Sequence, residues 1–228
     1  MRRGLGSSAA FCVAASAAIL DFYTGKPFDK ETINNIAYQA EKYFHINASG
    51  VDVSVSTYGG LIYFRKEFEF LKNISALTFK IPQKIENNLY LIDSGKPTES
   101  DQEMINAVGT LYNKKPQYIG QILNDLEKTT KRFVVSITKE DIQFFQQSLI
   151  DNEIFLEMLG VVSNKTRLLL KQLEPYGVGK IIGNGGKKSG SGYLLFYTEK
   201  TKDFENYCKK KKIFFSKFKQ DSGGLIKV

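Results

Sequence analysis

Residues 4–10 are the first stretch of the chain whose residue types and spacing suit the binding of a reactive ligand. They read Gly-Leu-Gly-Ser-Ser-Ala-Ala and lead directly into a run of strong helix formers. Glycines let the backbone approach an anion, the first helical N–H groups point at it, and the helix dipole favours its negative charge. The two serine hydroxyls add oxygen ligands for phosphate or Mg²⁺. The sequence predicts a phosphate-binding turn, with a capped buried helix as the alternative.

Two acidic residues stand out because their neighbours are apolar. Glu41 falls about 40° around a predicted helix from Ala37, so its carboxylate lies beside the buried stripe. Asp52 stands between Val51 and Val53 at the expected start of a strand. A carboxylate near a core needs a partner such as a metal ion, and burial tunes the proton affinity of an acid. Glu41 is therefore a candidate metal ligand and Asp52 a candidate base. A solvent-reaching glutamate and a turn-capping aspartate are the alternatives.

A glycine-rich stretch at residues 183–192 lies between two predicted strands. It is too long for a tight hairpin, and its glycine density permits close backbone contact with a ligand. The residue order of a Walker A loop is absent from it. A ligand-binding loop and a flexible surface hairpin both remain open. His45 is the only histidine and has no cysteine nearby, so a zinc site is not expected.

The elements that position these residues begin with a helix over residues 8–23, closed by Gly25. This helix is apolar nearly all round, so we expect it to be buried. Asp29 is placed to cap a second helix over residues 30–44, whose apolar residues follow helical spacing. Residues 51–64 and 68–71 are predicted as strands and a loop.

A second unit begins with a strand at residues 89–93, after a stretch without clear periodicity, and we predict the domain boundary after residue 77. Further strands are predicted over 179–182, 193–197, 213–218 and 225–228. Helices are predicted over 100–112, 116–131, 139–159, 164–174, with Ser163 as the last one's cap, and 201–211. The sequence thus predicts an α+β protein with domains at 1–77 and 78–228.

Composition narrows the class of protein. A chain of 228 residues with 42% hydrophobic residues is able to build a packed core. Much of the net charge of +8 comes from lysines near the C-terminus, so we read a solvated helix end and expect no nucleic-acid partner. The apolar run at residues 9–20 is too short to span a bilayer, so no membrane partner is expected. Two separate cysteines suit a reducing cytoplasm.

In this order, these features resemble the GHMP kinases, and among them the mevalonate kinases. Residues 4–10 resemble the family's phosphate-binding motif. Residues 45–52 resemble its H-G-N-P-S-G-V-D segment, and residues 55–60 its V-S-T-[WY]-G-G segment. Glu41 stands eleven residues before Asp52, where the mevalonate kinases carry a metal-binding acid.

The resemblance implies a fold, two ligands and a role for each residue. The fold is the remainder of an N-terminal ribosomal S5-like domain plus a C-terminal ferredoxin-like α/β sandwich. ATP and Mg²⁺ are implied, with Asp52 as the catalytic residue. The nucleotide-binding residues would be Gly4, Leu5, Gly6, Ser7, Ser8, Ala9, Gly183, Gly185 and Gly186. The substrate-binding residues would be His45, Ser49 and Gly50, and the Mg²⁺ ligands Ser8 and Glu41.

The chain also departs from the family pattern. Ile46 and Ala48 replace Gly and Pro in the substrate segment. The glycine-rich stretch resembles the family's third motif, G-A-G-G-G-G, but Asn184 replaces Ala there, and Lys187 and Lys188 interrupt the glycines. The family's first motif is not found before residue 4. We therefore expect little turnover from this chain by itself, and a complementary N-terminal segment or a second copy as partner.

The implied activity is ATP-dependent phosphorylation of a small-molecule hydroxyl, with mevalonate converted to 5-phosphomevalonate. Phosphorylation of phosphomevalonate or of a sugar by a member of the same superfamily is one alternative. A non-catalytic ligand-binding fragment is the other.

Overall fold

The computed structural model describes residues 5–45, 48–68, 71–183 and 185–227, and it divides into two compact units. The N-terminal unit comprises Gly6–Lys80 and the tail Gln220–Val228, and the C-terminal unit comprises Ile81–Lys219 together with Leu5. The sequence places the boundary three residues earlier and assigns the tail to the second domain. The structure groups the tail with the N-terminal unit because its hydrogen bonds are made there.

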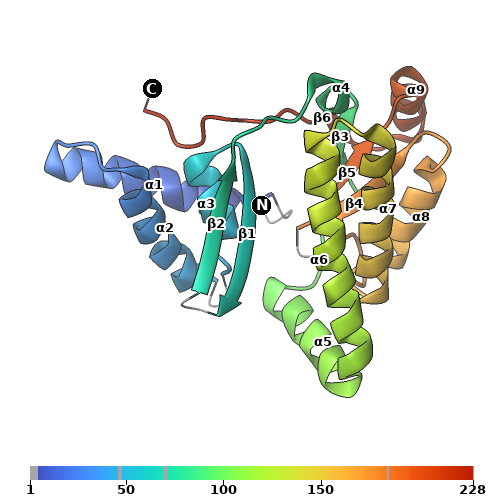
Figure 1. The fold of residues 1–228 in the computed structure, drawn as a ribbon, viewed down its shortest axis with the longest axis horizontal. Helices are drawn as coiled ribbons and strands as arrows, with labels where there is room; N and C mark the ends of the chain where they lie inside the picture. The colour runs from blue at the N-terminus through green and yellow to red at the C-terminus, as the bar shows by residue number, and fades with distance from the viewer. Residues whose placement is uncertain (1–4, 46–47, 69–70, 184, 228) are drawn as a thin grey trace. The chain divides into compact units, whose positions relative to one another are not determined.

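Within the described residues, the N-terminal unit consists of three helices and one antiparallel pair of strands (Figure 1). Asp29 caps the second helix as predicted, because its side chain accepts a hydrogen bond from the Thr32 amide at 2.8 Å. The elements are α1 (Ser7–Thr24), α2 (Lys30–Phe44), α3 (Val51–Tyr58), β1 (Leu61–Phe68) and β2 (Leu71–Leu77). The core is formed by Ala9, Cys12, Val13, Ile33, Ala37 and Val53.

The segment that begins at Val51 is a helix, so the predicted strand was wrong. Its β-branched residues favour strands, but burial recurs at Val53 and Thr57, which is helical spacing. Gly50 precedes the helix in the left-handed region, and the Ser54 hydroxyl donates to the Gly50 carbonyl at 2.8 Å. Asp52 therefore lies in the first turn of a helix and not on a strand.

Helix α1 is buried on one side only, so the prediction of all-round burial was also wrong. It packs against α2 and α3, and the opposite side leaves an apolar stripe exposed. Phe11 and Phe22 are 72% and 82% exposed. Among the described residues α1 is also the one helix long and apolar enough to cross a membrane, a test that core helices of soluble proteins pass as well. The expectation of no membrane partner stays a prediction.

The tail packs against the C-terminal end of α3. Residues 225–227 do not form the predicted strand, and Val228 lies outside the described residues. The Leu225 amide donates to the Thr57 carbonyl at 3.1 Å, and the Gly60 amide donates to the Asp221 carbonyl at 2.8 Å. Gly224 packs directly on the backbone between these two bonds. The tail thereby fixes the C-terminal end of the helix whose first turn carries Asp52.

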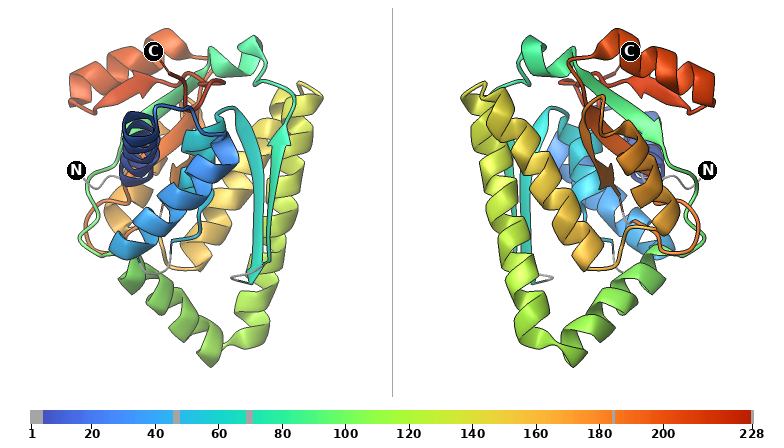
Figure 2. Two further views of the ribbon diagram at one scale, coloured as in Figure 1. Left: turned by 90° about the vertical axis from the view of Figure 1, so that its left-hand side faces the viewer. Right: turned by 90° about the vertical axis from the view of Figure 1, so that its right-hand side faces the viewer.

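The C-terminal unit is an antiparallel sheet of order β4-β5-β3-β6 with helices packed on it. Helices α6 and α7 lie side by side, and α5 and α6 form a V (Figure 2). The strands are β3 (Leu89–Asp93), β4 (Val178–Ile182), β5 (Tyr193–Tyr197) and β6 (Phe215–Lys217). The helices are α4 (Gln83–Glu86), α5 (Asp101–Lys114), α6 (Pro116–Thr138), α7 (Ile142–Met158), α8 (Asn164–Leu173) and α9 (Thr201–Lys211).

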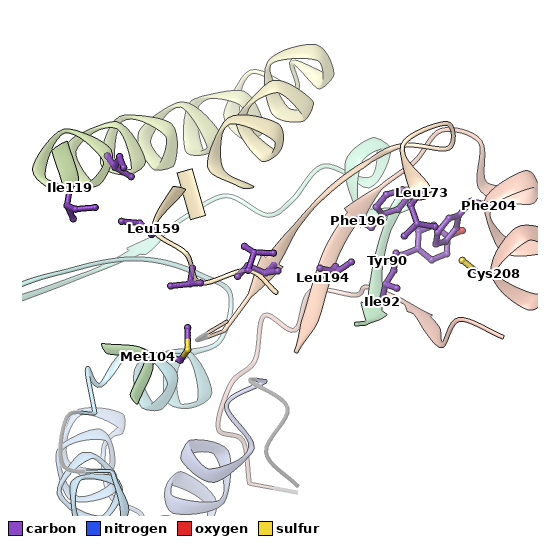
Figure 3. Packing of buried hydrophobic residues seen from close by; sticks show 14 residues of the cluster. Tyr90, Ile92, Met104, Ile119, Leu159, Leu173, Leu194, Phe196, Phe204 and Cys208 are labelled. Carbon is purple, nitrogen blue, oxygen red and sulfur yellow. The ribbon is translucent and has the colours of Figure 1, made fainter. Parts of the chain in front are cut away.

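Most of these elements follow the sequence prediction. The Ser163 side chain caps α8 as expected, whereas α6 runs on to Thr138 and α7 starts only after Asp141, whose side chain caps it. Aromatic rings pack together within a core that is otherwise largely aliphatic, with Phe204 stacked on Phe196 at 4.9 Å between centroids (Figure 3). The lysines in the last turn of α9 are exposed. The helix dipole favours positive charge at this C-terminal end. The predicted α+β class is confirmed.

Glu153 of α7 is a buried acid beside the edge strand β4. Its Oε2 accepts a hydrogen bond from the Ile181 amide at 2.7 Å, which satisfies an N–H on the outer side of the sheet. Its Oε1 has no hydrogen-bond partner among the described residues. Burial, only partly offset by the Ile181 amide and by Lys180, raises the pKa of Glu153 to about 7. The folded unit therefore favours the protonated form of this carboxyl group.

We expect the C-terminal unit to lose stability as pH rises from 4.5, the ordinary pKa of this carboxyl group, to about 7. Within this window the folded unit binds more protons than the unfolded chain, so the free energy of unfolding falls with rising pH. The loss is at most about 3 kcal/mol. Urea unfolding at about pH 5 and about pH 8 measures it.

The variant Glu153→Gln removes the titrating group and is expected to flatten this pH profile. Glu157→Gln, one turn further along α7, removes a carboxylate whose charge adds to the effect of burial on Glu153, so the loss of stability should persist in this variant but be smaller. Equal pH profiles for the unmutated chain and Glu153→Gln would contradict the expectation.

Candidate functional site

The N-terminus of α1 presents its first turn without a side-chain cap from the described residues. Gly6 adopts the left-handed region with φ 64°, and its carbonyl accepts from the Ala10 amide at 3.0 Å. Ser7 and Ser8 are exposed, and Ala9 is fully buried in the core of the unit. Leu5 is half exposed, and Gly4 lies outside the described residues. An uncapped helix start with exposed hydroxyls suits an anion such as phosphate.

Asp52 lies against this helix start. A Cβ atom placed on Gly6 would be 3.4 Å from both Cβ and Cγ of Asp52, an ordinary contact distance, so the Asp52 side chain lies directly beside the Gly6 backbone. Asp52 is exposed and belongs to the first turn of α3, where the helix dipole favours its negative charge. The N-terminal ends of α1 and α3 are therefore adjacent, and the carboxylate of Asp52 lies between them.

Glu41 is the second acid at this place. It lies in the last turn of α2 and is only 6% exposed. Burial, and then the negative charge of Asp52, raises the pKa of Glu41. Burial, and then the negative charge of Glu41, likewise raises the pKa of the Cys12 thiol. Ser8 is four residues before Cys12 on α1, so the two side chains lie on the same face of the helix, which is the face toward Glu41.

The donor set at this place fits Mg²⁺ shared with phosphates. Among the described residues no group of three or more His, Cys, Asp or Glu side chains gathers to hold a metal ion by itself. Mg²⁺ needs only one or two carboxylates when phosphate oxygens and water complete its shell. A buried carboxylate whose charge is disfavoured by a neighbouring carboxylate gains from such a cation.

The loop between α2 and α3 is anchored at both ends. The Tyr38 hydroxyl donates to the Ala48 carbonyl at 3.2 Å, and the Ser49 hydroxyl accepts from the Val51 amide at 3.2 Å. His45 is half-buried and Gly50 is buried with φ 88°. Residues 46–47, where the loop first departs from the family pattern, lie outside the described residues. The substrate-binding role of His45, Ser49 and Gly50 stays a prediction.

The glycine-rich loop of the C-terminal unit is packed, which disfavours the flexible-hairpin alternative. The Gly186 amide donates to the Val161 carbonyl at 2.8 Å, and both Gly185 and Gly186 are buried. Gly183 is exposed with φ 81°, and Asn184 lies outside the described residues. Four buried hydroxyl side chains join this loop to the start of α8, a network that the sequence did not reveal: Ser94, Ser163, Thr166 and Ser191. The nucleotide-binding role of the glycines stays a prediction.

Comparison with known proteins decides the family. Residues 1–60 match the GHMP kinases N terminal domain, and this range contains the helix starts and both acids described above. The chain belongs to the GHMP kinase superfamily. The expected family is thus confirmed.

Curated relatives of this GHMP kinase chain are named mevalonate kinase. The one from Archaeoglobus fulgidus is 30% identical over 87% of this chain and 63% of its own length. The one from Mus musculus is 27% identical over 82% of this chain and 50% of its own length. The chain thus spans about half to two thirds of the length of these relatives.

Solved structures agree on the fold. The crystal structure of L. major mevalonate kinase in complex with R-mevalonate superposes with a TM-score of 0.77 at 22% identity, covering 92% of this chain and 63% of that one. At this identity the likeness shows the GHMP kinase fold alone.

Proposed function

We propose that this chain is the catalytic part of an ATP-dependent kinase that phosphorylates a small-molecule hydroxyl, with mevalonate as the acceptor and 5-phosphomevalonate as the product. The observation that supports it is the position of Asp52, which lies in the first turn of α3 against Gly6 at the start of α1. A phosphate-binding helix start and a carboxylate side by side are what phosphoryl transfer to an alcohol requires.

In this proposal the start of α1 holds the phosphates of ATP through its first-turn N–H groups and the Ser7 and Ser8 hydroxyls. Asp52 accepts the proton of the acceptor hydroxyl and orients its oxygen toward the γ-phosphoryl group. Ser8 and Glu41 would hold Mg²⁺, which when bound supplies charge neutralisation on the phosphates. Because little covalent chemistry falls to the protein, positioning and electrostatics supply most of the rate.

The names of the relatives support mevalonate as acceptor, and the structural likeness leaves other acceptors of the superfamily as outcomes of the test. The phosphomevalonate kinase of Streptococcus pneumoniae, solved with phosphomevalonate and AMPPNP, also superposes, with a TM-score of 0.73 at 16% identity over 95% of this chain and 70% of that one. The acceptor is therefore best assigned by assay and not by fold.

Transfer of labelled phosphate from γ-labelled ATP to mevalonate, phosphomevalonate and galactose tests the proposal. We expect slow transfer that depends on the acceptor and is fastest with mevalonate. Faster transfer to phosphomevalonate or galactose would move the chain to the alternative kinases. Failure to bind Mg²⁺·ATP at all would favour a non-catalytic fragment.

The exposed stripe of α1 supports a polypeptide partner. Phe11, Ile19, Phe22 and Tyr23 are each more than half exposed, which is a large apolar surface for one helix. We propose that a complementary N-terminal segment of the family covers it and raises turnover. Sedimentation velocity of the chain decides between this partner and a second copy, since a dimer that Phe22→Ser dissociates would favour the second copy.

A further inference from the structure

The return half of the glycine-rich loop runs alongside residues 94–99, which connect β3 to α5. The Ser189 hydroxyl donates to the Lys96 carbonyl at 2.7 Å, and the Gly192 amide donates to the Gly95 carbonyl at 3.0 Å. Gly190 packs so closely on Gly95 that a Cβ atom at residue 190 would collide with the Gly95 carbonyl oxygen. These contacts fix residues 189–192, but they do not reach the tip of the loop.

The tip consists of Lys187 and Lys188, both exposed, where this chain departs from the glycines of the family pattern. The carboxylate of Glu99 accepts hydrogen bonds from the backbone amides of both lysines. Oε1 of Glu99 accepts a hydrogen bond from the Lys188 amide at 3.0 Å, and the Lys187 amide donates to the same carboxylate. Successive backbone amides that share one anion form a rigid turn, because each amide direction is then set by the same acceptor.

The electrostatics of Glu99 agree with this arrangement. Burial by itself would raise the pKa of Glu99, but it is outweighed by hydrogen bonds from the amides of Glu99 and Lys187, the Thr98 hydroxyl and the Lys188 amide, so the pKa is lowered. The side chain is therefore a carboxylate at neutral pH. A charged acceptor makes these hydrogen bonds stronger than neutral ones.

We propose that Glu99 is a positioning residue that fixes the Lys187–Lys188 tip, so that the glycine-rich loop meets the phosphates of a nucleoside triphosphate already ordered. The role toward the nucleotide rests on the proposed function. The hold on the loop does not, because it follows from the hydrogen bonds alone. Elsewhere in this loop close-packed glycines make the backbone rigid, and at the tip the Glu99 side chain has this role.

Three variants of the full chain separate the parts of this proposal. Glu99→Ala removes the acceptor, and Glu99→Gln keeps a carbonyl oxygen that accepts from the Lys188 amide without charge. Lys188→Ala is the matched control, because it removes the ammonium group but keeps the amide that Glu99 binds. Residue 99 is far from the tip along the chain, so the substitutions at Glu99 leave the intrinsic exchange rates of both tip amides unchanged.

Water-exchange NMR of the residue 187 and 188 amides gives the first readout. We expect exchange roughly five-fold faster in Glu99→Ala, as the loss of one or two surface hydrogen bonds allows. In Glu99→Gln the exchange rates of both amides should stay within about two-fold of those in the unmutated chain. In Lys188→Ala the exchange rate of the residue 187 amide should be unchanged, once the effect of the new neighbouring side chain on the intrinsic rate is corrected for. Unchanged exchange in Glu99→Ala would overturn the proposal.

Mg²⁺·ATP binding by calorimetry gives the second readout. We expect binding roughly five-fold weaker in Glu99→Ala and close to normal in Glu99→Gln, with the melting temperature of each shifted by less than about 2 °C. Equal binding by Glu99→Ala and the unmutated chain would overturn the role toward the nucleotide. If the unmutated chain binds no Mg²⁺·ATP, the proposed function fails and that role with it, while amide exchange still decides whether Glu99 holds the loop.

Discussion

Replacing Asp52 by asparagine is expected to lower phosphoryl transfer to mevalonate by about a hundred- to ten-thousand-fold, the usual contribution of a general base. Asparagine has the same shape and fits the space beside Gly6, but its amide does not accept the proton of the acceptor hydroxyl. The variant gives up only the interaction of the negative charge with the helix dipole, about 1 kcal/mol or less, so α3 should stay folded. Initial rates with saturating mevalonate measure the loss.

Two further measurements make this result specific to the base. Mg²⁺·ATP binding by Asp52→Asn should stay within a few-fold of normal, because the start of α1 is untouched. Asp21→Asn removes a carboxylate from the far end of α1, where it pairs with Lys227 at 2.8 Å, and should keep near-normal turnover. Turnover by Asp52→Asn within a few-fold of the unmutated chain, with normal ATP binding, would show that Asp52 is not the base.

The variant Gly224→Ala is expected to destabilise the N-terminal unit by about 3 kcal/mol, at the upper end for a single substitution. Gly224 has φ 59°, a conformation that costs other residues energy. Its new Cβ atom would lie 2.6 Å from the Thr57 carbonyl oxygen and closer still to the Gly59 amide nitrogen. These are backbone atoms of the chain at the end of α3, so they have no side-chain rotation with which to yield.

Gly223→Ala is the matched control for this prediction. A Cβ atom on Gly223 would meet its nearest neighbours at 3.4 Å and 3.6 Å, both ordinary contact distances, and its φ is not positive. We expect a change within about 0.5 kcal/mol. Urea unfolding followed through the residue 57 and 225 amides compares the two variants. Equal stability of the two would contradict the close packing of the tail on α3.

Local patterns in the sequence predicted the elements whose ends are fixed by nearby residues. Asp29 and Ser163 cap helices through amides three residues away, so spacing alone was sufficient to place α2 and α8. Helix α3 was missed because its β-branched residues favour a strand, and its burial depends on packing against α1 and α2. Local preference cannot reveal which face of a short segment a distant helix will cover.

The candidate site divides in the same way. Gly6, Glu41 and Asp52 were found because motif order and spacing carry them, and the structure brings their surroundings together in one unit. Glu99 and Gly224 were missed because each acts on backbone about 90 or 165 residues away along the chain. Their own neighbours in sequence contain no periodicity that points to such a partner.

We propose that the starts of α1 and α3 and the carboxylate of Glu41 form one metal-nucleotide site. Paramagnetic broadening by Mn²⁺·ADP, with Mn²⁺ replacing Mg²⁺, tests this directly. In a two-dimensional NMR titration of the full chain, the amides of residues 6–9 and of Asp52 and the side chain of Glu41 should broaden first and together. Broadening that begins elsewhere, or that reaches Glu41 without residues 6–9, would contradict the account.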